Sequence, residues 1–328
     1  MKAGLLARLL GVALVLGGPG LAVAAELRVA VSRGPVSLPL YVAQAKGFFA
    51  AEGLAVKMLE CHSGRECFQQ IESGAADLAT SAELIVTLDH VKAGPAVVIA
   101  TVSQSGQQIK LVARRSAGIE VPADLRGKRI GTVARTSAQY FLENWLLYHD
   151  IAMEQVTVVP LAIGQLVPEL ASRRVDAVAI WEPVAGEAAA RLGADQARLA
   201  APRVYAQHFV LSALRSQLAA RDADVQRLLR SLKKAEQFIA AHADEAAGML
   251  AARLQLEPAA ARATLAEHVY RLELTPALLS TMDSQARWAV RERIVEAAAG
   301  PGSVARAIDP GPLRKAVPGA VTLPAREP

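Results

Sequence analysis

Short apolar runs of strand length alternate with segments of helical periodicity from Glu26 onward. In the first part of the chain, the runs at 27–31, 54–59, 77–80 and 96–101 predict strands, and the segments at 39–45 and 63–73 predict helices. Ser63 and Glu66 have the spacing of a capping box, and Phe68 and Ile71 share one face of the second helix. This alternation predicts an α/β sheet with parallel strands.

A second alternating series follows, with strands predicted at 128–133, 156–160 and 177–180 and helices at 137–149 and 165–172. A β-prone segment at 204–213 then precedes a mainly helical region, 222–295, in which Asp222 and Asp224 lie at the favourable amino end and Pro258 and Pro276 lie where helices begin. We therefore predict an α/β fold of two lobes. Each lobe is a mainly parallel sheet flanked by helices, and two crossover strands near 104–111 and 204–210 join them.

The predicted boundaries follow from these two series. Residues 26–107 form the first part of lobe one, 108–205 form lobe two, and 206–308 return to lobe one with packed carboxyl-terminal helices. Residues 309–328 contain several prolines, and we expect an irregular tail there. About 300 residues remain after the amino-terminal segment, which is more than one hydrophobic core usually organises.

The amino terminus has the order of a secretory signal peptide. Lys2 and Arg8 precede an apolar run at 9–16, and a Gly/Pro break leads to small residues at 22–25. We expect residues 1–25 to be removed, with cleavage after Ala24 or Ala25, and the mature chain to be periplasmic. The apolar run is roughly half of the ~20 residues that span a bilayer. A retained anchor is the alternative, and no later segment predicts membrane insertion.

Composition narrows the classes of partner. Apolar residues make up 52% of the chain and charged residues 20%, which is typical of a packed globular protein. The net charge is +5, the basic residues are scattered among acidic ones, and only 4% of residues are aromatic. No nucleic-acid partner is therefore expected. Mild basicity helps to attract anions.

The two cysteines, Cys61 and Cys67, lie in one short segment of a chain that is predicted to be exported. We expect a disulfide between them, because the periplasm is oxidising. The alternative is a metal site that uses both cysteines and His62. No second cluster of ligands completes a tetrahedron, so no metal is expected.

Five segments resemble one family when they are taken together and in order. They are PLYVAQAKGFF at 39–49, EGLAV at 52–56, SGAADLATS at 73–81, PADLRGKRIG at 122–131 and RRVDAVAIWEP at 173–183. The chain resembles the nitrate/sulfonate/taurine-type solute-binding proteins of ABC transporters from Leu27 to about Ala240. The resemblance implies a type II periplasmic-binding-protein fold that closes on a small-molecule ligand. It also implies an ABC permease and its ATPase as partners, and we expect a monomer without a cofactor.

In open α/β sheets the ligand lies beyond the carboxyl ends of the strands, where helix amino termini favour anions. Four such junctions are predicted, at 33–37, 62–64, 81–83 and 135–137, with Arg33 and Arg135 as candidate cationic contacts. Tyr140 follows the last junction, Trp181 and Glu182 end the final strand of lobe two, and together they suggest an aromatic wall. Helix capping without ligand contact is the alternative role of Ser63, Ser81 and Thr136. The candidate ligand-binding residues are Arg33, Gly34, Ser37, His62, Ser63, Gly64, Ser81, Ala82, Glu83, Gln104, Thr136, Ser137, Tyr140, Trp181 and Glu182.

The charges at these junctions leave the ligand class open. The helix termini and the two arginines favour a sulfonate, nitrate or carboxylate, whereas Glu83 and Glu182 repel an anion unless they are paired or point away. The alternative ligand is a thiamine-precursor pyrimidine or a similar heterocycle.

A periplasmic sensor without transport and a pyrimidine-synthase-like enzyme are alternatives of other classes. The relatives that synthesise the pyrimidine look to depend on a Cys-rich iron segment, and this chain has no such segment. The G-x-S-x-G, P-loop and HExxH signatures are also absent. We therefore expect no catalytic residues.

Overall fold

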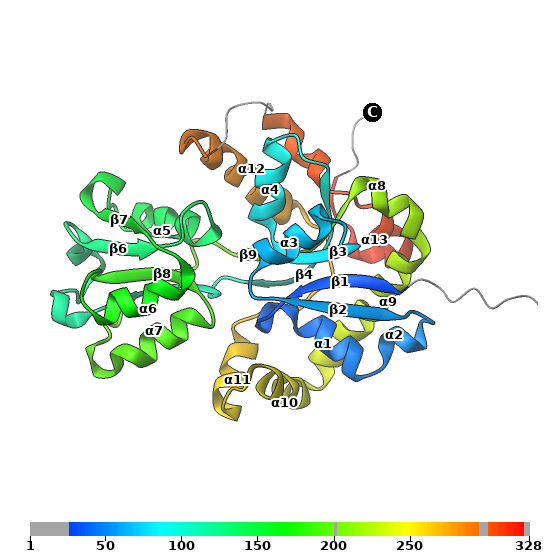
Figure 1. Ribbon diagram of the computed structural model, residues 1–328, viewed down its shortest axis with the longest axis horizontal. Coiled ribbons are helices and arrows are strands. Elements are labelled where there is room, and N and C mark those ends of the chain that lie inside the picture. The colour runs from blue at the N-terminus through cyan, green and yellow to red at the C-terminus, as the bar shows by residue number, and fades with distance from the viewer. Residues whose placement is uncertain (1–25, 200–201, 295–300, 325–328) are drawn as a thin grey trace, which may run out of the picture.

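The computed structural model describes residues 26–199, 202–294 and 301–324 (Figure 1). The predicted signal peptide lies outside the described residues. The strands are β1 Leu27–Ser32, β2 Val56–Cys61, β3 Leu78–Ala82, β4 Ala96–Ser105, β5 Ile109–Ala113, β6 Arg129–Thr132, β7 Thr157–Pro160, β8 Ala177–Trp181 and β9 Gln207–Leu214. The α-helices are α1 Leu38–Ala45, α2 Phe48–Ala51, α3 Gly64–Glu72, α4 Glu83–Val91, α5 Ser137–Tyr148, α6 Ile163–Ala171, α7 Val184–Leu192, α8 Arg215–Leu218, α9 Asp222–Ala241, α10 Ala243–Leu254, α11 Pro258–Ala266, α12 Pro276–Arg291 and α13 Gly311–Ala316.

Within the described residues the strands form two sheets, each flanked by helices (Figure 1). The sheet of lobe one has the order β2-β1-β3-β9-β4, in which β9 runs antiparallel to both of its neighbours and the other pairs are parallel. The sheet of lobe two has the order β5-β8-β6-β7, in which β5 is the antiparallel strand. The prediction of an α/β fold with two mainly parallel sheets is confirmed.

The strand directions decide which edges of the two sheets face each other. Strand β4 leads into β5 through only three residues, so its carboxyl end points toward lobe two. Strands β1, β2 and β3 run parallel to β4, so their carboxyl ends point the same way. In lobe two, Trp181 at the end of β8 pairs with Ile109 at the start of β5, and β6 and β7 run parallel to β8. The carboxyl ends of the parallel strands in each lobe therefore point toward the other lobe.

Local signals explain several of the helices. The Ser63 hydroxyl caps α3 by accepting a hydrogen bond from the Glu66 N–H at 3.2 Å. The Glu66 carboxylate accepts from the His62 N–H instead of the Ser63 N–H, so only half of the predicted capping box forms. In α9, the apolar residues at helical spacing, among them Leu228, Leu232 and Ile239, are buried. This face of α9 packs on α1 and α13.

The expectation of an irregular tail at 309–328 was wrong for part of that segment, because residues 311–316 form helix α13. Pro312 occupies a position in the first turn, where its fixed φ suits a helix and its missing N–H costs nothing. Leu313 is fully buried and anchors the helix to lobe one.

Strand β5 overlaps the crossover strand that was predicted near 104–111, whereas helix α7 was not predicted from the sequence. The region 222–295 also contains a non-helical stretch, in which Val269 and Glu273 form bridges to β4.

Candidate functional site

The junction that follows β2 is fixed by contacts within a few residues. Cys61 and Cys67 form the predicted disulfide, with their Cα atoms 5.4 Å apart, and it encloses the predicted residues His62, Ser63 and Gly64. His62 is exposed, and Ser63 and Gly64 are partly buried. A side chain on Gly64 would place its Cβ 3.0 Å from the Cα of Ser81. The amino terminus of α3 is therefore in direct contact with the end of β3.

The junction that follows β1 contains one exposed cation and one buried hydroxyl. Arg33 is exposed, whereas Gly34 and Ser37 are buried. The Ser37 hydroxyl donates to the Ser32 carbonyl at 2.7 Å, and the Gly34 N–H donates to the Tyr41 hydroxyl at 3.4 Å. Ser37 thus holds the turn in place, and Arg33 is the residue at this junction whose charge faces solvent.

The junction that follows β3 is the most deeply buried of the four. Ser81 is fully buried, and its hydroxyl has no hydrogen-bond partner among the described residues. Ala82 is also buried. The Glu83 carboxylate, fully buried, accepts hydrogen bonds from the Tyr205 hydroxyl at 2.6 Å and the Gln285 Nε2 at 2.7 Å. Burial raises the pKa of Glu83 to about 7, although these hydrogen bonds act in the opposite direction.

Glu83 also extends the pairing between β3 and β9 beyond the carboxyl end of β3. The His208 N–H on β9 donates to Glu83 at 3.1 Å, next to the position where β3 ends. The carboxylate takes the place of the carbonyl that a longer β3 would have offered. All three polar contacts of Glu83 therefore lie inside the fold, and its contact with a ligand stays a prediction.

The junction that follows β6 begins with Arg135, which is exposed and has a positive φ of 60°. Its N–H donates to Gln139 Oε1 at 2.8 Å. The Thr136 hydroxyl caps α5 by accepting from the Ala138 N–H at 3.2 Å. Ser137 is buried, and its hydroxyl accepts from Gln207 Nε2 at 2.9 Å.

Tyr140, one turn further along α5, is buried between two aromatic rings. Its ring centroid lies 5.1 Å from that of Tyr205 and 5.3 Å from that of Trp288, both in edge-to-face geometry. Its hydroxyl donates to the Ser284 hydroxyl at 3.2 Å. Tyr140 thus packs against two aromatic residues, Tyr205 and Trp288, that were not predicted for the site, and an aromatic wall formed with Trp181 stays a prediction.

Trp181 and Glu182 at the end of β8 are partly buried. The Glu182 carboxylate pairs with the Lys110 ammonium at 2.9 Å and accepts from the Gly186 N–H at 2.8 Å. Lys110 also pairs with Glu267 of lobe one at 2.9 Å. Burial would lower the pKa of Lys110, but the two carboxylates more than offset this, so its pKa is raised. Glu182 is therefore an ion-paired carboxylate that shares the positive charge of Lys110 with Glu267.

On the lobe-one side of this region, Gln104 near the end of β4 is partly buried. Its Nε2 donates to Glu273 Oε1 at 3.2 Å.

His208 is a further buried polar residue that sequence reasoning missed. It is 3% exposed, and neither ring nitrogen has a hydrogen-bond partner among the described residues. Burial lowers its pKa to about 4, so the imidazole is neutral. Ser81 pairs with Val210, which places His208 on the same face of the sheet and one step nearer to lobe two. No local pattern marked it, because Gln207 and His208 together precede the apolar residues at 209–211.

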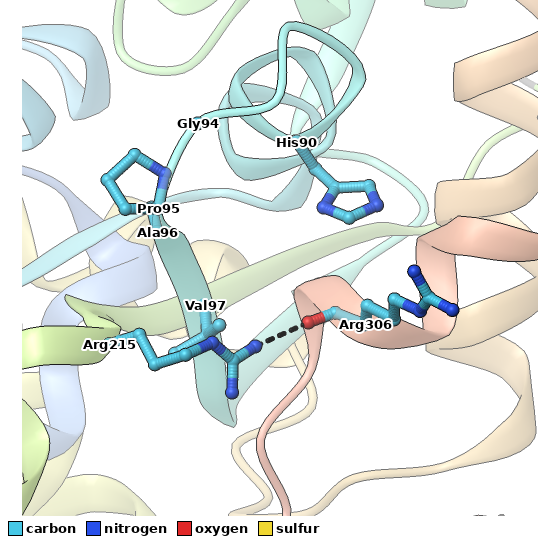
Figure 2. A pocket seen from close by; sticks show the side chains of 7 residues that line it. All are labelled: His90, Gly94, Pro95, Ala96, Val97, Arg215 and Arg306. Atoms are coloured by element: carbon cyan, nitrogen blue, oxygen red, sulfur yellow. Dashed lines mark hydrogen bonds between the residues drawn. The ribbon is translucent and has the colours of Figure 1, made fainter. Parts of the chain in front are cut away.

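Two cavities in lobe one lie away from these junctions. One, of about 410 Å³, lies at the start of β4, which is the end of the sheet that points away from lobe two. Figure 2 shows its lining, in which Arg215 donates to the Arg306 carbonyl at 2.7 Å. The other, of about 340 Å³, lies between α9 and the residues near Glu273 and Val317. Neither is lined by a predicted site residue.

The described parts of the chain contain no cluster of three or more His, Cys, Asp or Glu side chains that is arranged to hold a metal ion. They also contain no helix whose length and apolar character suffice to cross a bilayer.

The fold and the facing junctions define an α/β protein of two lobes, and comparison with known proteins gives its family. Residues 34–246, well over half of the chain, match the family described as NMT1/THI5 like, and the chain belongs to this family. It is similar to a putative binding protein of Brucella abortus (strain 2308), with 24% identity over 66% of this chain and 68% of that protein. It is also similar to a 4-amino-5-hydroxymethyl-2-methylpyrimidine phosphate synthase of Uromyces fabae, with 34% identity over 30% of this chain and 29% of that enzyme.

Solved structures show the same fold. The alkanesulfonate-binding protein SsuA from Xanthomonas axonopodis pv. citri, bound to MOPS, superposes with a TM-score of 0.71 at 19% identity, over 87% of this chain and 98% of that chain. The desulfurization enzyme DSZB superposes with a TM-score of 0.66 at 19% identity, over 90% and 99%. The resemblance found in the sequence is therefore confirmed, and both binding proteins and enzymes share the fold.

Proposed function

We propose that the protein is the extracytoplasmic solute-binding component of an ABC importer, and that it captures a small anion between its lobes by hinge closure. The observation that carries the proposal is that the strand-to-helix junctions of the two lobes face each other. This is the geometry in which a ligand is enclosed from two sides. The similarity to binding proteins, including one that is bound to a sulfonate buffer, supports the same function.

The charges at the junctions support an anion of the sulfonate, nitrate or carboxylate type. Arg33 and Arg135 are exposed beside the junctions, and the leading N–H groups of α3 and α5 have no partners inside their helices. Glu182 is paired with Lys110, and Glu83 is enclosed within lobe one. The two carboxylates that would repel an anion thus have partners within the protein, and we propose that Glu83 does not contact the ligand.

Native mass spectrometry of the purified protein, followed by calorimetric titration with MOPS, nitrate and 4-amino-5-hydroxymethyl-2-methylpyrimidine without its phosphate, tests the ligand class. We expect MOPS or nitrate to bind, and Arg33→Ala and Arg135→Ala to weaken binding about tenfold each, because a charge-assisted hydrogen bond contributes about 1.5–3 kcal/mol. Arg191→Ala, at an exposed position of α7, is the matched control and leaves affinity unchanged. Binding of the pyrimidine compound alone would replace the anion with the heterocycle.

The similarity to a pyrimidine phosphate synthase favours a second candidate, a pyrimidine binder or an enzyme of pyrimidine chemistry. Incubation of the protein with each bound compound, with a search for any change of mass, separates the two functions. We expect the compounds to be recovered unchanged. A product of altered mass would make the protein an enzyme.

Export, monomeric state and partners belong to the same proposal. We infer that residues 1–25 direct the chain to the periplasm and are removed, and that the mature monomer delivers its ligand to an ABC permease with its ATPase. Amino-terminal sequencing of the periplasmic fraction should begin at Ala25 or Glu26. A cytoplasmic full-length chain would contradict it.

A further inference from the structure

One face of helix α5 is turned toward lobe one. Ser137, Tyr140 and Glu143 follow one another at a spacing of three, which places them on the same side of the helix. All three are buried, although each of them carries a hydroxyl or a carboxyl group. Each of them contacts a residue that belongs to lobe one or to the return connection.

The contacts with α12 are polar as well as aromatic. The Trp288 indole N–H donates to Glu143 Oε2 at 2.6 Å, and the Arg291 guanidinium lies 3.5 Å from the same oxygen. Tyr140 adds its hydroxyl bond to Ser284 and its edge-to-face contact with Trp288. Helix α12 packs on α4 of lobe one, so these contacts cross from one lobe to the other.

The same cluster reaches the β3–α4 junction through Glu83. Tyr205, in the return connection, contacts the Tyr140 ring and donates its hydroxyl to Glu83. Gln285 on α12 donates to Glu83 and also to the Tyr205 hydroxyl at 3.2 Å. Because the three hydrogen-bond partners of the Glu83 carboxylate all donate, a side chain with two acceptor oxygens matches this place.

We propose that Glu83, Tyr140, Tyr205, Gln285 and Trp288 form an interlobe joint that sets the orientation of lobe two relative to lobe one. Glu83 and Tyr205 are positioning residues in this joint. Glu83 is the first residue of α4 and follows Ser81 and Ala82 directly, and Ser137 is the first residue of α5. The joint thus links a candidate ligand junction of lobe one with that of lobe two through side chains alone.

The interlobe joint is tested on the ligand-free protein by measuring a distance between the lobes. Spin labels on Lys92→Cys and Ser172→Cys, both at exposed positions, report this distance by pulsed electron resonance. Tyr205→Phe removes one buried hydroxyl from the joint. Ser231→Ala, the control, removes one buried hydroxyl from α9, where it bonds the Phe48 carbonyl at 3.0 Å. We expect a displaced and broader distance distribution for Tyr205→Phe and an unchanged one for Ser231→Ala.

A second pair of variants keeps the test decisive if Tyr205→Phe does not fold. Trp288→Phe removes the indole donor to Glu143, whereas Trp145→Phe makes the same change in the core of lobe two, where Trp145 is equally buried. The joint predicts a changed distribution for Trp288→Phe only. Distributions for Tyr205→Phe and Trp288→Phe that match the unsubstituted protein, or equal changes in the control variants, would overturn the proposal.

A ligand measurement extends the test and rests on the proposed function. If MOPS binds the unsubstituted protein, Tyr205→Phe should weaken it fivefold or more, which is about the lower limit of coupling between distant sites, and Ser231→Ala should not. Failure of MOPS to bind the unsubstituted protein would count against the proposed ligand class only, because the distance measurement uses no ligand. Unchanged MOPS affinity in Tyr205→Phe would count against the joint.

Discussion

The two neighbouring junctions of lobe one are held in opposite ways. The β2–α3 junction is fixed by a disulfide, a helix cap and a glycine that all lie within seven residues of one another. The β3–α4 junction is fixed by Glu83, whose partners Tyr205 and Gln285 are 122 and 202 residues away in the chain. The first junction forms wherever its own residues are folded, whereas the second requires the return connection and α12. Damage to the first should therefore stay local, and damage to the second should reach both lobes.

The largest effect is expected when Glu83 is replaced. Glu83→Ala leaves the Tyr205 hydroxyl, the Gln285 amide and the His208 N–H buried without their acceptor. Unsatisfied buried donors cost about 1–3 kcal/mol each and are not additive, so we expect a loss of about 3 kcal/mol or more in the free energy of unfolding. Urea denaturation measures it. A loss below about 1 kcal/mol would show that the long-range junction is not held by Glu83.

Removal of the disulfide should cost less and act locally. The double change Cys61→Ser with Cys67→Ser opens a short loop, for which we expect a loss of about 2 kcal/mol in the free energy of unfolding. Hydrogen exchange should increase at the start of α3 and not in α5 or α12. Thiol titration of the unfolded, unreduced protein should first find no free sulfhydryl. Increased hydrogen exchange in lobe two would show that loss of the disulfide is not confined to the β2–α3 junction.

The pH dependence of stability separates the buried groups. The pKa of Glu83 rises from 4.5 to about 7, so the folded chain holds a proton that the unfolded chain lacks, and this contribution to stability falls as pH rises through that window. His208 and His268 have pKa values lowered from 6.5 to about 4, so their contributions fall as pH drops from 6.5 to 4.

The Glu and His contributions oppose one another between pH 4.5 and 6.5. Glu83→Gln removes the Glu contribution and should steepen the loss of stability on acidification by about 1.4 kcal/mol per pH unit. His208→Gln should make the loss shallower by the same amount. Urea denaturation at several pH values between these limits measures both slopes. A slope for Glu83→Gln equal to that of the unsubstituted protein would show that Glu83 ionises as it does in the unfolded chain.

The smallest effect concerns the glycine at which the two junctions touch. Gly64→Ala brings a Cβ to 3.0 Å from the Ser81 Cα, so α3 must shift slightly. We expect a loss of about 1 kcal/mol in the free energy of unfolding, which thermal denaturation measures. Gly248→Ala in α10 meets no atom within 4 Å and should stabilise the protein by roughly 0.5–1 kcal/mol. A loss of stability in both variants would show that the close approach of Gly64 to Ser81 is not the cause of the effect.

The sequence by itself determined the features that depend on neighbours in the chain. Alternating patterns predicted two mainly parallel sheets, the spacing of Ser63 and Glu66 predicted the start of α3, and the proximity of Cys61 and Cys67 predicted their disulfide. These features are local, since hydrogen bonding and side-chain direction over a few residues decide them. The family motifs added the order of the two lobes.

The tertiary structure alone decided how the polar groups at the junctions are used. The sequence placed Glu83 beside a ligand, but its hydrogen-bond partners come from the return connection, β9 and α12. Nor did any local pattern indicate the buried His208 or the contact of Tyr140 with Trp288. A single chain sets no distance between residues that are a hundred or more positions apart. Only the packing of α5, α12 and the return connection brings them within hydrogen-bonding range.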